Sequence, residues 1–157
     1  MDRKTLTRAL RIGLVGLTGV FLVVQLVPVD RANPPVEMEV DAPAEVLSVL
    51  RTSCYDCHSN ETTWPWYSRV APVSWLVARD VREGREHVNY STWGRYTAED
   101  RAEKQAETWE DVEEGEMPPG IYTLMHPDAR LSEQDRAALR GWALQASHME
   151  SAEGERD

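Results

Sequence analysis

Two cysteines and a histidine stand within five residues of one another, in the order Cys54-Tyr-Asp-Cys57-His58, and the chain has no other cysteine. This is the spacing of the attachment motif for c-type haem, in which both thiols are joined to haem vinyl groups and the imidazole binds the iron. Thiols three residues apart on one helical turn point to the same side, which suits that chemistry. The motif therefore predicts one covalently attached haem c with His58 as its proximal ligand.

Three other uses of a Cys-x-x-Cys pair compete with this interpretation. A thioredoxin-like redox pair needs a strand before the motif, whereas the residues before Cys54 have a helical pattern. A structural disulfide leaves His58 unexplained. A zinc site needs two more ligands, and the remaining histidines are not paired at the short spacing that zinc sites favour: His87, His126 and His148.

The sixth iron ligand is expected from the segment Gly115-Glu-Met117-Pro-Pro119. Two prolines stiffen this turn and remove two backbone donors, so the Met117 thioether can be aimed at the distal face of the haem. His126 is the alternative distal ligand. Met125 and His87 are weaker candidates, because His87 lies in a charged helical stretch.

An aromatic cluster, Trp64-Pro-Trp66-Tyr67, follows the motif by six residues. Its rings would exclude water from an apolar porphyrin, so Trp64, Trp66 and Tyr67 are candidate haem contacts. The same residues also suit the ordinary core of a small domain with a single phenylalanine.

Four helices are expected around these residues, and no segment alternates like a strand for long. They are residues 43–54, residues 72–88, residues 97–115, which Thr97 and Asp100 open as a capping box, and a last helix from Ser132. The expected architecture is an all-α, cytochrome c-like domain over residues 43–149, followed by a polar tail over residues 150–157.

The N-terminal residues 1–29 predict a membrane anchor. Residues 12–29 carry no charge, and four basic residues precede them: Arg3, Lys4, Arg8 and Arg11. This asymmetry places the N-terminus in the cytoplasm and the rest of the chain outside. A cleaved signal peptide is the alternative, although no clean cleavage site follows the apolar run. Residues 30–42 contain Pro34 and Pro35 and predict an extended tether of about 40 Å.

The charge balance restricts the partners. The whole chain of 157 residues has a formal charge of −10, and residues 30–157 carry −13. Nine acidic residues stand between Glu99 and Glu116, without the spacing of an EF-hand. A nucleic-acid partner is disfavoured, and a basic redox protein is the expected partner.

The chain resembles the small membrane-anchored c-type cytochromes of bacteria known as haem-binding domain proteins. The resemblance runs over residues 43–147, and its motifs are these: Cys54-Tyr-Asp-Cys-His-Ser-Asn60, Thr63-Trp-Pro-Trp-Tyr-Ser68, Ala71-Pro-Val-Ser-Trp75, Asp80-Val-Arg-Glu-Gly-Arg85, Asn89-Tyr-Ser91 with Trp93, Met117-Pro-Pro119 with Tyr122 and His126, and Leu131-Ser132 with Trp142. The resemblance implies an all-α monohaem domain behind one membrane helix. The charge asymmetry of the N-terminal residues predicts that this domain lies on the periplasmic side of the plasma membrane.

Three functions are compatible with these features. The first is one-electron transfer by a six-coordinate haem with His58 and Met117 as ligands, in a protein that is not an enzyme by itself. The second is a peroxidase-like enzyme with an open distal site, for which His126 would be the base; only one haem motif is present, which argues against it. The third is a haem-based sensory module, although no signalling domain is attached.

Overall fold

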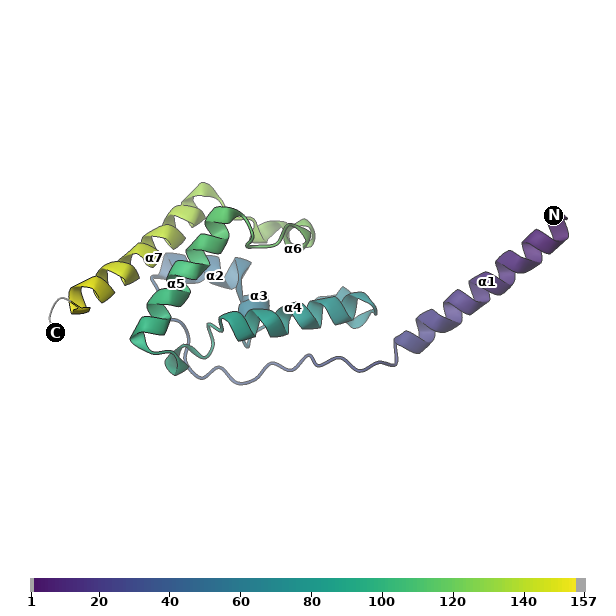
Figure 1. Ribbon diagram of the computed structural model, residues 1–157, viewed down its shortest axis with the longest axis horizontal. Helices are drawn as coiled ribbons and strands as arrows, with labels where there is room; N and C mark the ends of the chain where they lie inside the picture. Colours follow the sequence, from purple (N-terminus) through teal and green to yellow (C-terminus); the bar gives the residue numbers. More distant parts are fainter. Residues whose placement is uncertain (1, 155–157) are drawn as a thin grey trace. The chain divides into compact units, whose positions relative to one another are not determined.

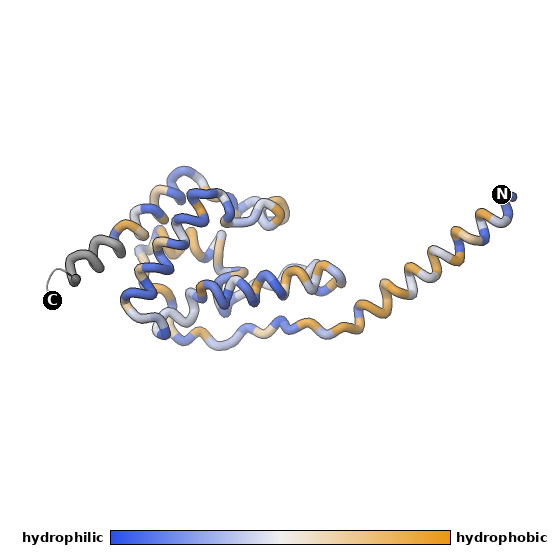
Figure 2. The backbone as a smooth tube through the Cα atoms, viewed as in Figure 1, coloured by the Kyte–Doolittle hydropathy of each residue, from blue (hydrophilic) through white to orange (hydrophobic). Residues whose placement is uncertain are grey.

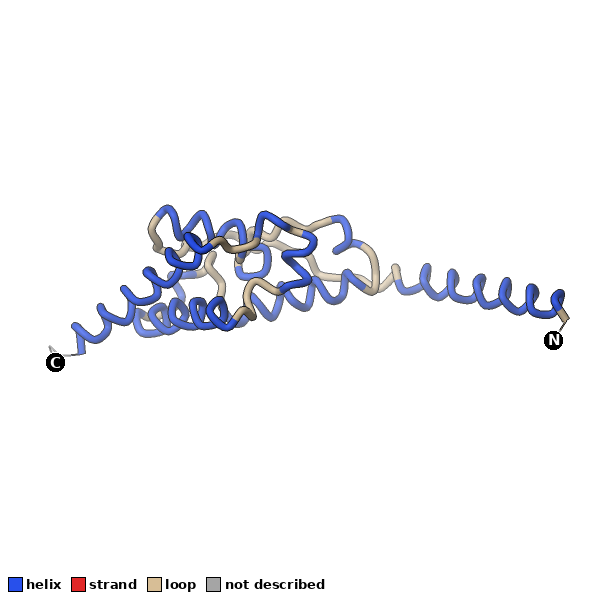
Figure 3. The backbone as a smooth tube through the Cα atoms, turned by 90° about the horizontal axis from the view of Figure 1, so that it is seen from above, coloured by secondary structure: helices blue, strands red, loops and turns tan. Residues whose placement is uncertain are grey.

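The computed structural model describes residues 2–154, with side chains described through residue 145. Within these residues the chain is helical and has no strand (Figure 3), which confirms the predicted all-α class. The α-helices follow one another in the order shown in Figure 1: α1 Arg3–Val24, α2 Ala44–Ser53, α3 Tyr55–His58, α4 Val73–His87, α5 Ala98–Glu114, α6 Gly120–Met125 and α7 Glu133–Gly154. Short 3-10 helices occupy Trp66–Arg69, Trp93–Arg95 and Pro127–Ala129.

The chain divides into two compact units. Unit 1 contains the chain up to Ala32 together with Trp64–Asp80. Unit 2 contains Asn33–Thr63 and everything from Val81 onward. Helix α4 contributes to both units, since its residues up to Asp80 belong to the first and those from Val81 to the second. Within the predicted domain of residues 43–149, residues 64–80 therefore belong to unit 1.

Unit 2 is built around a buried aromatic and aliphatic core. Helices α5 and α7 pack against each other most extensively, and α2 packs against α7. Trp93 lies at the centre, with its ring 6.0 Å from that of Tyr90 and 6.3 Å from that of Trp142. The other buried members are Val40, Val46, Val49, Leu50, Tyr55, Val88, Val112 and Leu139. Burial of a side chain of this size is worth about 1.5–3 kcal/mol, so this core fixes the elements around the haem motif.

The helix ends form where their capping residues predict. Thr97 Oγ1 accepts the Asp100 N–H, while the Asp100 carboxylate accepts the Thr97 N–H, and Gly115 ends α5 with a φ of 79°. Ser132 and Asp135 make the same reciprocal pair before α7. Helix α7 continues to Gly154, into the predicted tail, and residues 155–157 lie outside the described residues.

Residues 33–40 form an extended strap that is bound to unit 2. The Val40 N–H donates to the Tyr90 carbonyl at 2.9 Å, and the Met38 carbonyl accepts the Trp93 N–H at 3.0 Å. Asn60 Nδ2 donates to the Pro35 carbonyl, and Glu37 is ion-paired with Arg95. Residues 35–40 of the predicted extended tether, residues 30–42, are thus hydrogen-bonded to unit 2, which satisfies backbone groups that would otherwise bond to water.

Helix α1 is long and apolar enough to cross a membrane, with a mean hydropathy of 1.6 over its most apolar window and no buried residue. Its apolar residues give the orange stretch of Figure 2. The helix begins at Arg3 and ends at Val24, so residues 25–29 of the predicted uncharged run lie beyond it. The Gln25 amide donates to the Ala71 carbonyl and accepts the Ala71 N–H, and Pro28 cannot continue a helix.

Candidate functional site

The Cys-x-x-Cys-His motif forms a single tight turn between two helices of unit 2. Cys54 ends α2, and its carbonyl accepts the N–H groups of Cys57 and His58 at 3.1 and 2.9 Å. The two cysteines are not joined in a disulfide: Cys54 directly precedes α3, and Cys57 lies within that helix. Tyr55, between them, is buried and stacks on Tyr90 at a centroid distance of 5.8 Å. The turn is thus fixed from within the core.

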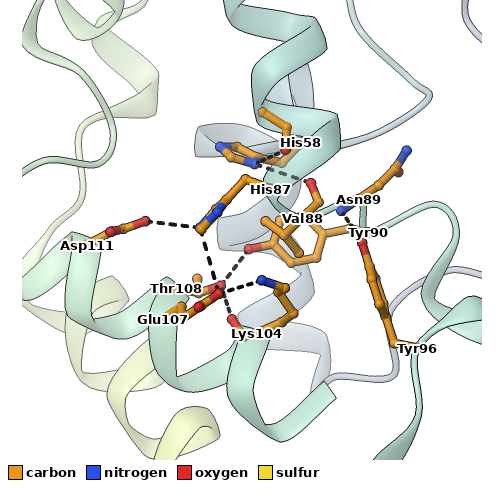
Figure 4. Close-up of polar contacts among 11 residues, drawn as sticks. His58, His87, Val88, Asn89, Tyr90, Tyr96, Lys104, Glu107, Thr108 and Asp111 are labelled. Carbon is orange, nitrogen blue, oxygen red and sulfur yellow. Dashed lines mark hydrogen bonds and ion pairs between the residues drawn. The ribbon is translucent and has the colours of Figure 1, made fainter. Parts of the chain in front are cut away.

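His58 is buried, and the orientation of its ring is set by backbone carbonyls. Its Nδ1 lies 3.0 Å from the Gly84 carbonyl oxygen and 3.3 Å from that of Val88, near the C-terminal end of α4 (Figure 4). Since carbonyls only accept hydrogen bonds, Nδ1 carries the proton and Nε2 keeps its lone pair. Burial lowers the pKa of His58, although the two carbonyls act in the opposite direction. The imidazole is therefore neutral and presents Nε2 as a metal ligand.

Helix α4 approaches the motif so closely that only glycine fits at position 84. A Cβ atom added there would lie 2.8 Å from the Cys57 carbonyl oxygen and 3.2 Å from the Cys57 Cβ. Gly84 therefore lets α4 contact the haem motif directly, and the same approach supplies the carbonyl that orients His58.

The thiol of Cys54 is in an environment that disfavours its charged form. Burial, and next the nearby Cys57, raise the pKa of Cys54 to about 12. The folded chain therefore keeps Cys54 as a neutral thiol at pH 7. Among residues 2–145, whose side chains are described, no group of three or more His, Cys, Asp or Glu side chains could hold a metal ion. Helix α2 precedes Cys54, whereas a thioredoxin-like pair needs a strand at that place.

Asp56, the second residue between the cysteines, links the motif to the segments around it. Its Oδ1 accepts the Thr63 N–H at 2.8 Å, and its Oδ2 accepts the Tyr122 hydroxyl at 2.9 Å. Its backbone carbonyl accepts the Thr62 hydroxyl at 2.8 Å. Through Tyr122, α6 is attached to the turn that carries the cysteines.

The two candidate distal ligands lie on either side of α6: Met117 precedes this helix, and His126 follows it. Met117 is half-buried against the core of unit 2, and its N–H donates to the Asp111 carbonyl at 3.1 Å. His126 follows α6, stacks on the Tyr122 ring at 4.2 Å and places its Nδ1 3.2 Å from the Tyr122 carbonyl oxygen. The choice between Met117 and His126 stays a prediction.

The aromatic cluster lies in unit 1, whereas the haem motif lies in unit 2. Trp64 and Tyr67 are half-buried, and Trp66 is exposed with its ring 5.8 Å from that of Tyr67. Their predicted role as haem contacts stays a prediction. His87 is on the surface of unit 2, with Nε2 3.8 Å from Glu107 and 3.9 Å from Asp111, which fits its low rank as a ligand (Figure 4).

Several residues that hold the site were missed by reading the motif alone. Asp56 occupies a variable position of the motif, and the contribution of Val88 is a backbone carbonyl, which no side-chain pattern reveals. Gly84 did leave a signal: it is an isolated glycine inside a predicted helix, where glycine costs about 1 kcal/mol relative to alanine.

These observations test whether the residues fit a haem. The two thiols are three residues apart on one turn, the adjacent imidazole is neutral with Nε2 as its acceptor, and the tight contact at Gly84 holds the turn. A porphyrin joined to two cysteines and ligated by the neighbouring histidine needs this donor set, so the residues fit the group.

Comparison with known proteins gives one finding. Residues 19–145 match the model of a family described as haem-binding domain, which covers most of the chain. No curated protein and no solved structure matches this chain.

Proposed function

Because the chain belongs to the haem-binding domain family, which establishes that it binds haem, we propose that the haem is of the c type and is attached through Cys54 and Cys57. We also propose that the protein transfers single electrons at the outer face of the bacterial plasma membrane. The bound iron would supply the one-electron couple. The chain's own residues hold and orient it, and the proposal gives the protein no enzymatic reaction of its own.

The observation that carries this proposal is the geometry of His58. A ligating histidine commonly donates its second N–H to a carbonyl, which fixes the tautomer and the ring plane. Here the carbonyls of Gly84 and Val88 occupy that position. His58 would therefore be the proximal ligand, with Cys54 and Cys57 as the covalent attachment points.

The covalent link is tested by extraction. We expect the purified protein to retain its haem in acid acetone and to give a pyridine haemochrome band of the c type. The control is the Cys54→Ser, Cys57→Ser variant, whose haem should pass entirely into the organic phase. Loss of haem from the wild-type chain under the same conditions would contradict covalent attachment.

Helix α1 supports the proposed location. It is a 22-residue helix with no buried residue, and the basic residues of its first turns favour a cytoplasmic N-terminus. We expect alkaline carbonate to leave the protein in the membrane fraction and protease added to intact spheroplasts to reach unit 2. A soluble form whose sequence begins near Asp30 would show instead that the segment is a cleaved signal peptide.

The acidic surface of α5 suggests a basic redox partner. Exposed Glu110, Glu113 and Glu114 lie on this helix, which Figure 2 colours mostly blue. Electrostatic steering of this kind raises association rates about 10-fold or more and weakens with salt. We expect the rate of reduction by a basic cytochrome, in stopped flow, to fall about 10-fold between roughly 0.01 and 0.1 M ionic strength.

Two charge-matched variants test the position of that surface. Glu110→Lys on α5 should reduce the salt dependence, whereas Glu133→Lys, which changes the net charge equally at the start of α7, should change it less. A salt profile that is flat for both a basic and an acidic carrier would remove the acidic surface from the proposal.

A further inference from the structure

We propose that residues 66–76 of unit 1 lie in the headgroup region of the bilayer, beside the C-terminal end of α1, and that this segment is a second contact of the protein with the membrane. The inference rests on the proposed function in one respect, the membrane-spanning role of α1. The partner of this segment is a lipid surface. The part of the protein that contacts the lipid, called the apolar patch below, consists of Trp66, Val73, Trp75 and Leu76.

The first observation is the exposure of these side chains. Trp66 is 73% exposed and Leu76 56% exposed, and Val73 and Trp75 are also exposed. They fall within eleven residues, on the 3-10 helix Trp66–Arg69 and on the first turn of α4. A patch of large apolar side chains is costly in water and usually marks an interaction surface. Tryptophan in particular is enriched where hydrocarbon meets headgroups.

The second observation is that this segment is fixed to the end of α1. Gln25 Nε2 donates to the Ala71 carbonyl at 3.2 Å, and Gln25 Oε1 accepts the Ala71 N–H at 2.9 Å. Arg31 Nη1 donates to the Ser68 carbonyl at 3.2 Å. These bonds all lie within unit 1, so the apolar patch is attached to the point at which α1 ends.

The third observation is the length of α1. Between Ile12 and Val24 it has thirteen uncharged residues, which span about 20 Å, less than the hydrocarbon thickness of about 30 Å. Leu26 and Val27, after the helix, are also exposed. The apolar surface therefore continues past the helix into the loop and on to the patch, which places the patch near the membrane boundary once α1 is inserted.

The charge of the segment fits an anionic surface. Residues 64–79 contain Arg69 and Arg79 and no acidic residue, although the whole chain carries −10. Arg31 and Arg69 line a cleft of about 150 Å³ together with Ala71, Ser74 and residues 25–29, which follow α1. Two guanidinium groups beside an apolar surface suit lipid phosphates, since arginine pairs with phosphate through two parallel N–H groups.

Photolabelling from the lipid tests the proposal. The haem-loaded full chain is placed in vesicles of phosphatidylcholine and phosphatidylglycerol that contain a lipid with a diazirine near its headgroup, and adducts are mapped on tryptic peptides. We expect adducts on the peptide of residues 70–79, which carries Val73, Trp75 and Leu76. The internal control is the peptide of residues 105–130, whose α6 exposes Ile121 by 74% and Leu124 by 65%.

Labelling of peptide 70–79 should exceed that of peptide 105–130 at least several-fold, and Leu76→Asp should reduce it several-fold with the haem spectrum unchanged. Leu124→Asp, a matched change on α6, should leave it unaltered. Equal labelling of both peptides, or none on 70–79, would overturn the proposal. If Trp66→Ala alters the haem spectrum and leaves the lipid adducts unchanged, the patch belongs to the haem instead.

The same preparation separates this inference from the proposed anchor. If carbonate releases the protein, the membrane-spanning role of α1 fails, and with it the proposed location. If the protein stays integral and peptide 70–79 remains unlabelled, the anchor stands and only the second contact fails.

Discussion

Replacing Gly84 with alanine is expected to destabilise the protein by about 1–3 kcal/mol and to reduce its haem content. In an ordinary helix interior this substitution stabilises, by about 1 kcal/mol. Here the new Cβ would lie 2.8 Å from a backbone oxygen of Cys57 and 3.1 Å from its carbonyl carbon, and neither atom can move without displacing the turn. Displacement of α4 would also move the carbonyls that orient His58. Thermal unfolding and the ratio of Soret to protein absorbance measure the two effects.

Gly141 provides the matched control for this substitution. It lies inside α7, and a Cβ added there meets nothing within 4 Å. Gly141→Ala should therefore raise the stability by up to about 1 kcal/mol and leave the haem content unchanged. Equal stability and full haem loading in both variants would show that α4 does not pack tightly against the motif.

Replacing Met117 with alanine is expected to abolish the weak far-red absorption band of the ferric protein and to allow stoichiometric binding of carbon monoxide by the ferrous protein. Both changes follow if the Met117 thioether is the sixth ligand, since alanine has no donor to replace it. The half-buried position of Met117, and the two prolines after it, keep the thioether from moving freely. Absorption spectra of both oxidation states measure the outcome.

Met125→Ala and His126→Ala complete this experiment. Met125 is an exposed methionine of the neighbouring α6, so its replacement should leave both spectra unchanged. If His126→Ala removes the band and Met117→Ala does not, histidine is the distal ligand. Carbon monoxide binding by the unaltered protein would indicate an open sixth position, which favours the peroxidase-like alternative.

The helices predicted best from the sequence are those that begin at a side-chain cap. Thr97 with Asp100, and Ser132 with Asp135, mark the starts of α5 and α7 because each pair satisfies backbone N–H groups locally. Helix α6 was not predicted. It has six residues, and Ile121 and Leu124 are exposed, so its apolar residues do not follow the core-facing pattern on which sequence analysis depends.

The core of the site followed from the sequence, and its supports did not. The spacing of Cys54, Cys57 and His58 predicted a haem cofactor, which the family match supports, and the attachment of the haem through these residues stays a prediction. The supports of His58 are backbone carbonyls of α4, and the strap is bound mainly through backbone groups of Tyr90 and Ser91. Any side chain brings the same carbonyl, so such contacts leave no trace in residue types.

The distance along the chain between the haem motif and its supports has a consequence for biosynthesis. Gly84 lies 26 residues after His58, and Arg95 lies 58 residues after Glu37, its ion-pair partner in the strap. A chain synthesised at about 5–20 residues per second completes the cysteines roughly 1–5 s before the part of α4 that encloses them. During this interval α4 does not yet pack against the turn that carries Cys54 and Cys57. If haem is attached through both cysteines, as proposed, the order of synthesis provides a period for the attachment before α4 packs against their turn.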